Sequence, residues 1–214
     1  MEILKTKTIK EDTSLLRIVH TQWLSVCRDM ESAPNYARLQ NDIDQGYEWL
    51  FDGFRHTFSI LKGKSTLGWE EVIEKFPHTI HVYLGGLMDL LYFPDLPLAE
   101  IENYKKVFIA TQKMAQIGNW ISNWEREILQ GDFTSPVMLF GFHRGLIRPE
   151  DIESDNVVQR VKDSRLEDYF LQEWHALRHQ CHQICEKVND PNLKDYVESF
   201  SIILHMQIAG GNRI

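Results

Sequence analysis

Apolar residues recur every three or four positions along most of this chain, which is the period of an amphipathic α-helix. The first two such faces consist of Leu15, Leu16, Val19, Trp23 and Val26, and then of Tyr47, Leu50, Phe51, Phe54, Phe58 and Leu61. The pattern predicts one long helix over residues 99–129 and further helices from 148–151 onward, over 166–188 and over 192–208. No stretch alternates as a strand would, so the pattern predicts an all-α protein.

Glycine and proline separate the predicted helices, because these residues favour turns over continued helix. The breaks fall at residues 33–35, 62–65, 93–97 and 131–136. Ser65, Thr66 and Asp95 are candidate N-caps of the helices that follow. Gly85 and Gly86 lie inside a predicted helix, where they would allow a second helix to pack closely.

The composition indicates one folded domain over residues 1–214. With 43% hydrophobic and 25% charged residues, a chain of 214 residues can bury a substantial core. Acidic residues outnumber basic residues by 31 to 23. This balance argues against a nucleic-acid or anionic-membrane surface, because both kinds of binding need a basic patch.

The first residues and the cysteines predict a cytoplasmic protein. The opening segment, MEILKTKTIKEDT, has no apolar signal region, and no run of about 18 apolar residues that could span a membrane occurs. Cys181 and Cys185 lie one helical turn apart, where a disulfide would need distortion, and Cys27 makes the number of cysteines odd. We therefore expect reduced thiols in a reducing compartment.

Three oxygen-bearing side chains are spaced by single helical turns near the end of the long helix. Asn119, Asn123 and Glu127 stand at i, i+4 and i+8, beside Arg126. Successive members rotate by only about 40° around a helix, so all three share one stripe. Amide and carboxylate oxygens suit Mg²⁺ or Mn²⁺ better than zinc, and the guanidinium could bind a phosphate group. The alternative is a set of polar positions that face solvent.

The surrounding segment IGNWISNWEREILQGDF, residues 117–133, resembles the second metal-binding motif of class I terpene synthases. Asn119, Arg126 and Glu127 match that motif, and Asn123 stands where the family has serine or threonine. Upstream, residues 66–83 resemble the helix-entry segment of the family, in which the matching residues here are Glu70, Glu71, His78 and Thr79. The resemblance covers most of residues 15–208. It implies the C-terminal portion of a terpenoid synthase-like helical bundle, without the first helices.

The resemblance also implies an activity, the Mg²⁺-dependent ionisation and cyclisation of a prenyl diphosphate by a carbon–oxygen lyase. In that activity Asn119, Asn123 and Glu127 would hold Mg²⁺, with Mn²⁺ as an alternative, and Arg126 would bind the diphosphate. Trp120 and Trp124 alternate with the two asparagines. Aromatic side chains of this kind would line a cavity and stabilise a carbocation, and packing in the core is their other role.

A second hypothesis follows from the carboxylates that the chain lacks. No Asp-Asp-x-x-Asp cluster occurs, and Asp42, Asp44 and Asp52 have a different spacing. The chain would then be a shortened terpene synthase relative that is inactive alone or works with a partner. A bundle without its first helices would expose apolar faces, which predicts a homodimer or a partner chain that supplies the missing helices.

A third hypothesis is a helical metalloprotein of a different kind. His175, His179 and His182 follow one another at i, i+4 and i+7, so three imidazoles share one predicted helix face. With Cys185 or Glu173 they could bind zinc or iron. The alternative is a histidine-rich face in contact with solvent.

Overall fold

The computed structural model describes residues 14–61, 68–132, 134–151 and 156–211. Within these ranges the chain is helical and contains no strand, which confirms the prediction of an all-α protein. The α-helices are α2 (Ser14–Glu31), α3 (Tyr36–Leu61), α4 (Trp69–Lys75), α5 (Val82–Leu91), α6 (Ile101–Leu129), α7 (Pro136–His143), α8 (Val157–Asp163), α9 (Leu166–Val188) and α10 (Pro191–Gly211). Short 3-10 turns are η1 (Phe76–Thr79), η2 (Leu98–Glu100) and η3 (Pro149–Asp151).

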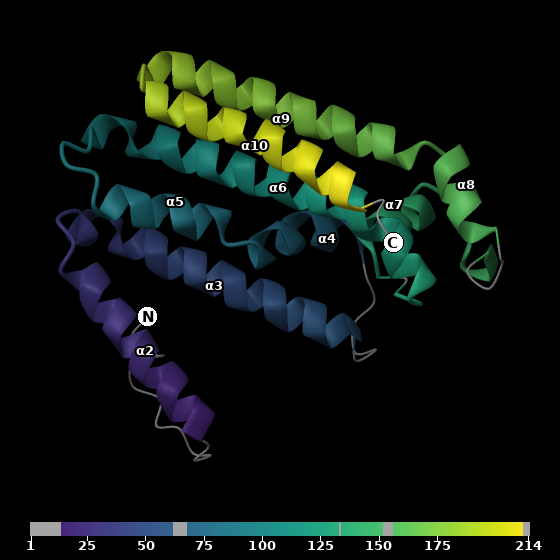
Figure 1. The fold of residues 1–214 in the computed structure, drawn as a ribbon, viewed down its shortest axis with the longest axis horizontal. Coiled ribbons are helices and arrows are strands. Elements are labelled where there is room, and N and C mark those ends of the chain that lie inside the picture. Colours follow the sequence, from purple (N-terminus) through teal and green to yellow (C-terminus); the bar gives the residue numbers. More distant parts are fainter. Residues whose placement is uncertain (1–13, 62–67, 133, 152–155, 212–214) are drawn as a thin grey trace.

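Helix α6 is the centre of the molecule, and most other elements pack against it. It contacts α9 and α10 along most of its length, α5 on another side and α7 near its end. Figure 1 shows α9 and α10 as an antiparallel pair beside α6, with α5 and α3 forming further rows and α2 projecting from the edge of the bundle. Because α6 is covered on several sides, many of its residues are buried, Val107, Met114 and Trp124 among them.

The close contact between α5 and α6 depends on one glycine. A Cβ atom built on Gly86 would lie 2.5 Å from Phe108 Cγ, which is far too close for any side chain. Gly85 is exposed and would have nothing within 4 Å of such an atom. The predicted role in close helix packing is therefore confirmed for Gly86, whereas Gly85 faces away from α6.

The predicted breaks match the ends of the helices in the described ranges, with one correction. The sequence predicted Asp95 as the N-cap of the long helix, but that helix begins at Ile101, and its N-cap position is Glu100, without a capping side-chain bond. The reason is that Pro97 enters the 3-10 turn η2, so the chain coils before α6 begins. Ser65 and Thr66, the other predicted caps, lie outside the described residues.

The cysteines are free thiols in the core, as expected. Cys27, Cys181 and Cys185 are all buried and unpaired by disulfides. Burial raises the pKa of the Cys181 thiol to about 12. Such a thiol stays protonated and unreactive near neutral pH, so Cys181 serves as a small apolar side chain.

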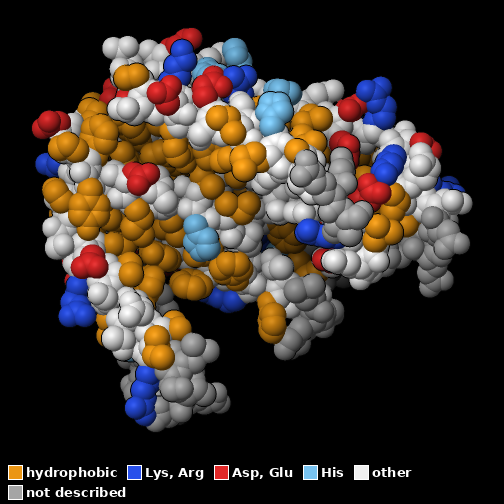
Figure 2. All heavy atoms as spheres, in the orientation of Figure 1, with side chains coloured by type: hydrophobic (Ala, Val, Ile, Leu, Met, Phe, Trp, Pro, Cys, Tyr) orange, Lys and Arg blue, Asp and Glu red, His pale blue; other side chains and the backbone are white. Residues whose placement is uncertain are grey.

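Some apolar side chains remain exposed on the surface. On α10 they are Ile202, Ile203 and Met206, and on α3 they are Phe54 and Phe58. Figure 2 shows the molecule in the orientation of Figure 1, and on this side hydrophobic side chains gather where α5, α6 and the start of α10 lie. Among the described residues, no helix has both the length and the apolar composition needed to cross a lipid bilayer.

Candidate functional site

The two asparagines of the predicted stripe lie next to each other on α6. Both are half-buried, and Asn123 Nδ2 donates a hydrogen bond to Asn119 Oδ1 at 2.7 Å. This bond fixes the amide orientations, so Asn119 presents an oxygen that still has a second lone pair. The structure therefore brings two of the three predicted metal ligands together.

The third predicted ligand, Glu127, lies one turn further along α6, where its surroundings disfavour the charged form of its carboxyl. Burial raises the pKa of its carboxyl above the ordinary value, and the charge of Asp132 raises it further, while the Ser135 hydroxyl and the Arg126 guanidinium oppose the shift. Glu127 Oε2 and Ser135 Oγ are both buried, and neither accepts or donates a well-formed hydrogen bond within the described part of the chain. A buried carboxylate oxygen without a partner is costly. A cation at this position would remove the cost.

Helix α6 ends directly after Glu127 in a turn that positions Asp132. Gly131 has a φ of 77°, its N–H donates to Ile128 O at 2.9 Å, and the N–H of Asp132 donates to Glu127 O at 2.8 Å. These bonds form a Schellman motif, for which glycine is the favoured residue because it has no Cβ atom. The turn reverses the chain, so that Asp132 approaches the Glu127 carboxylate.

Asp132 also orders the chain that leads into α7. Its Oδ1 accepts hydrogen bonds from Thr134 N at 2.9 Å and from Thr134 Oγ1 at 2.6 Å. The second carboxyl oxygen is not used in these bonds. The candidate-ligand prediction did not include Asp132, although the Gly131-Asp132 pair after the helix was the available signal for a turn that returns a carboxylate to the helix end.

The donor set of this site fits a hard divalent cation. Two amides and the carboxylates of Glu127 and Asp132 offer only oxygen, which Mg²⁺ and Mn²⁺ prefer. The guanidinium of Arg126 is exposed and forms no ion pair with any described carboxylate, so it is available to an anion. No hydrogen bond in the described ranges joins the Glu127 side chain to either asparagine, so the three predicted ligands do not form one hydrogen-bonded cluster.

Among the described residues, no hydrogen bond or ion pair joins the matching residues of the upstream segment to this site. His78 stacks on Trp49 at 4.9 Å and lies 3.2 Å from Gln112 Nε2, and its burial, with the charge of Lys113, lowers the pKa of its imidazole. Thr79 Oγ1 donates to Phe76 O within η1. Of the matching residues, Glu70 lines a cleft, which is described next.

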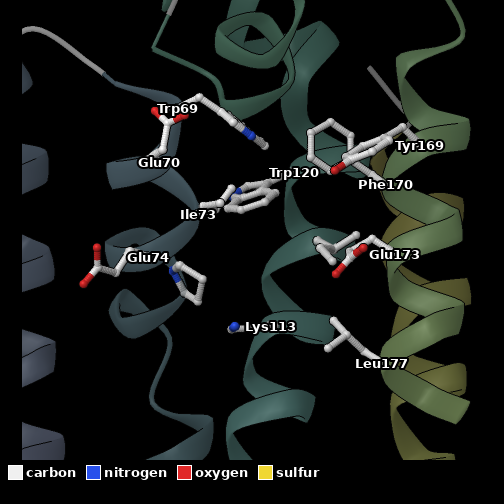
Figure 3. Close-up of a pocket in the computed structure, with 12 residues that line it drawn as sticks. Trp69, Glu70, Ile73, Glu74, Lys113, Trp120, Tyr169, Phe170, Glu173 and Leu177 are labelled. Carbon is white, nitrogen blue, oxygen red and sulfur yellow. The ribbon is translucent and has the colours of Figure 1, made fainter. Parts of the chain in front are cut away.

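An aromatic cleft of about 450 Å³ lies between α4, α6 and α9. Its aromatic lining consists of Trp69, Trp120, Tyr169 and Phe170. Figure 3 shows Trp120 in the middle of the cleft, between α4 on one side and α9 on the other. The expectation that aromatic side chains line a cavity therefore applies to Trp120. Trp124 is instead packed in the core at 1% exposure, with Nε1 donating to Glu167 Oε1 at 2.5 Å.

The stripe formed by the three predicted ligands on α6 does not line this cleft. Asn119, Asn123 and Glu127 are absent from its walls, whereas Trp120 is part of them. Neighbouring residues on a helix are rotated by about 100° from each other, so the stripe and the cleft occupy adjacent faces of α6. They are two separate candidate sites.

The three histidines of α9 do not assemble a metal site. His175 and His179 are exposed, and His179 Nε2 lies 3.1 Å from Gln183 Nε2. His182 Nε2 instead lies 3.1 Å from Glu198 Oε1 on α10. Over the described ranges, no three histidine, cysteine, aspartate or glutamate side chains gather closely enough to hold a metal ion.

No protein-family model matches the chain, and comparisons with curated sequences and with solved structures found no match either. A function for this protein therefore has to be argued from the stripe, from its surroundings and from the motif resemblance.

Proposed function

We propose that this protein is terpene synthase-like and binds a prenyl diphosphate together with Mg²⁺ at the end of α6. The observation that carries the proposal is the buried Glu127 carboxyl, which lies near a second carboxylate, Asp132. In the described part of the chain its Oε2 forms no well-formed hydrogen bond and has only a weak interaction with the Ser135 hydroxyl. A buried carboxylate whose negative charge is opposed only in part by Arg126 and lies near that of Asp132 is suited to a cation. The resemblance to the terpene synthase motif suggests Mg²⁺ as the cation and a prenyl diphosphate as the substrate.

Each residue has a defined task in this proposal. Asn119, Asn123 and Glu127 would hold the metal through oxygen, and the unused oxygen of Asp132 is available beside them. Arg126, which is exposed, would bind the diphosphate from the same helix end. Bound Mg²⁺ would neutralise part of the negative charge of the leaving diphosphate. The proposed reaction class is a carbon–oxygen lyase, with cyclisation of the prenyl chain as the following step.

Thermal unfolding with and without Mg²⁺ and inorganic diphosphate tests the binding part of this proposal. A ligand present at 100 times its dissociation constant stabilises a protein by about 2.7 kcal/mol, which corresponds to a rise in Tm of roughly 5–10 °C for a chain of this size. Asn119→Ala should lose most of this rise. Asn103→Ala is the matched control, because Asn103 is another half-buried amide on α6 and bonds Glu100 instead.

Product analysis tests the catalytic part. Incubation with Mg²⁺ and geranyl, farnesyl or geranylgeranyl diphosphate should yield a hydrocarbon or alcohol if the chain is a competent lyase. Stabilisation by Mg²⁺ and diphosphate without turnover would support a binding-only relative. Absence of both stabilisation and turnover would contradict the proposal.

The exposed apolar side chains favour a partner-dependent version of the same function. Ile202 and Met206 on α10 are 64% and 69% exposed, on a helix whose other residues pack against α6 and α9. Exposed apolar residues that gather on one face are typical of association surfaces. Light scattering during size-exclusion chromatography would reveal a homodimer, and the Ile202→Ser, Met206→Ser double variant should then elute as a monomer.

A further inference from the structure

The aromatic cleft carries an excess of negative charge at its rim. Three of its lining residues are carboxylates, Glu70 and Glu74 from α4 and Glu173 from α9, and one is an ammonium, Lys113 from α6. No ion pair among the described residues joins Lys113 to any of the three. In Figure 3 Glu173 extends from α9 toward the middle of the cleft, whereas Glu74 points away from it. Glu173 is therefore a carboxylate that points toward an occupant of the cleft.

The floor of the cleft consists of aromatic rings held in fixed orientations. Trp120 and Phe170 are buried and meet edge to face, with ring centroids 5.7 Å apart and an angle of 75° between the planes. Trp69 meets Phe170 in the same manner at 6.1 Å. Such mutually perpendicular rings resist rotation, and the faces that they leave free carry the negative part of the ring quadrupole. The floor and the rim thus favour the same sign of ligand charge.

One buried donor in the cleft has no acceptor. Trp120 is 5% exposed, and its Nε1–H has no hydrogen-bond partner in the described part of the chain. Figure 3 shows this nitrogen on the side of the ring that faces Ile73 of α4, at the wall of the cleft. A buried N–H without an acceptor is rare and costs free energy. An occupant with an oxygen atom at this position would satisfy it.

We propose that the cleft between α4, α6 and α9 binds a small organic cation, a quaternary or protonated amine with an apolar body and an oxygen acceptor. The carboxylates attract the charged group, the aromatic floor accepts its apolar and cationic surface, and Trp120 Nε1 donates to the oxygen. A neutral hydrocarbon would leave the carboxylates unused. An inorganic cation would gain little from an apolar floor, which cannot replace its water ligands. This site goes beyond the proposed function and does not depend on it.

Benzoylcholine is a suitable probe, because it has an aromatic ring, an ester oxygen and a quaternary ammonium. Its neutral carbon isostere, 3,3-dimethylbutyl benzoate, has the same shape without the charge. Isothermal titration and saturation-transfer NMR should show binding of benzoylcholine, and the isostere should bind about tenfold more weakly or worse, as expected for loss of a desolvated cation–π contact and its Coulomb attraction. Equal binding of both compounds, or no binding of benzoylcholine up to about 10 mM, would overturn the proposal.

Charge variants test which sign of ligand charge the cleft prefers. Glu173→Gln should weaken benzoylcholine binding by about fivefold, and Lys113→Gln should strengthen it by a few-fold, since one removes an attraction and the other a repulsion. Glu186→Gln, an exposed glutamate on the same helix but outside the cleft, should leave the affinity unchanged. If Lys113→Gln weakens benzoylcholine binding instead, charge does not determine recognition in the cleft and the proposal is wrong.

The donor of Trp120 is tested by Trp120→Phe, which keeps an aromatic ring and removes the N–H. It should weaken benzoylcholine by about threefold to tenfold and leave tetramethylammonium, which has no acceptor, nearly unaffected. Unchanged benzoylcholine binding would remove the oxygen acceptor from the proposal. Because Trp120→Phe also changes core packing, circular dichroism and the Tm must show that the variant is folded. The surface variants Glu173→Gln and Lys113→Gln test the site without this risk. The response to Mg²⁺ and diphosphate should be unchanged in both surface variants, so failure of one proposal is distinguishable from failure of the other.

Discussion

The oxygen stripe of α6 and the histidine stripe of α9 have nearly the same spacing but different surroundings. Each consists of three polar residues separated by single helical turns. On α6 the stripe is half-buried, its two amides bond to each other, and Glu127 lies under the turn that leads to α7. On α9 two of the three imidazoles face solvent, and the third contacts α10.

Helical spacing alone therefore does not define a site. The two stripes differ in whether a second segment of the chain covers the side chains and contributes a further candidate ligand. After α6 the Gly131 turn returns Asp132 to the helix end. Beside α9, the carboxylate of Glu198 contacts one histidine of the stripe, His182, and already accepts two hydrogen bonds from Arg178. Five measurements test this comparison, in order of decreasing expected effect.

Glu127→Gln should abolish the stabilisation by Mg²⁺ and inorganic diphosphate. The expected loss is the whole effect, about 2.7 kcal/mol when the ligands are present at 100 times their dissociation constants. The His175→Ala, His179→Ala double variant should retain it. Thermal unfolding of both variants measures the difference, and a response that survives Glu127→Gln would contradict the assignment of the stripe.

Gly131→Ala should destabilise the protein by about 1–2 kcal/mol, because a Cβ atom is strained at positive φ. Gly145→Ala is a close control, since Gly145 also has a positive φ, 66°, and neither glycine has an atom within 4 Å of an added Cβ. Urea unfolding should give similar losses for both. Only Gly131→Ala should also weaken the Mg²⁺ response, and equal responses would show that the turn does not shape the site.

The raised pKa of Glu127 predicts a pH dependence in the absence of metal. Because the pKa is higher in the folded state than in the unfolded state, the native protein is favoured while Glu127 is protonated, and this advantage is lost as pH rises through the folded-state pKa. Glu127→Gln, which cannot ionise, should be more stable than the wild type at pH 7 by about 1 kcal/mol. The difference should vanish near pH 4. A constant difference across this range would mean that desolvation of the carboxylate is not its cause.

Glu198→Gln should cost about 0.5–1 kcal/mol, the usual value for a partly exposed ion pair with good geometry. The Arg178 hydrogen bonds, at 2.9 and 2.6 Å, lower the pKa of Glu198. Its contribution is therefore present above the ordinary glutamate pKa and is lost as pH falls through the lowered value. The stability gap between wild type and variant, measured by urea unfolding, should narrow below about pH 4.

The smallest effect is expected for the exposed histidines. His175→Ala and His179→Ala should each change the free energy of unfolding by no more than about 0.5 kcal/mol, as surface substitutions usually do. Metal analysis of the purified protein is the stricter test. Stoichiometric zinc or iron that disappears in the double variant would reverse the comparison and favour the histidine stripe.

The sequence predicted the helices well, because the apolar period and the glycine and proline breaks act locally. Residues 166–188 were predicted as a helix, and α9 has these bounds. Asp95 was placed wrongly because the choice between a cap and a 3-10 turn depends on Pro97 and on the packing of the turn. The spacing of Asn119 and Asn123 was likewise sufficient to place both amides on one stripe.

The environment of the candidate sites was not predictable in the same way. The surroundings of Glu127 Oε2 depend on the turn at Gly131 and on the position of Ser135, which in turn depends on how α7 packs. The cleft joins Trp69, Trp120 and Glu173, which are distant in the sequence and meet only because α4, α6 and α9 pack together. No periodicity contains this information.

The central position of α6 also constrains how the chain acquires its shape during synthesis. The segment that covers most of α6, residues 166–211, emerges from the ribosome after α6 itself. Contacts of this sequence separation close late, because a long loop must be ordered first. Until residues 166–211 have been synthesised, the part of the chain before residue 166, about three quarters of it, leaves apolar sides of α6 uncovered. Nascent chains that stall before residue 166 should therefore be the ones that recruit chaperones.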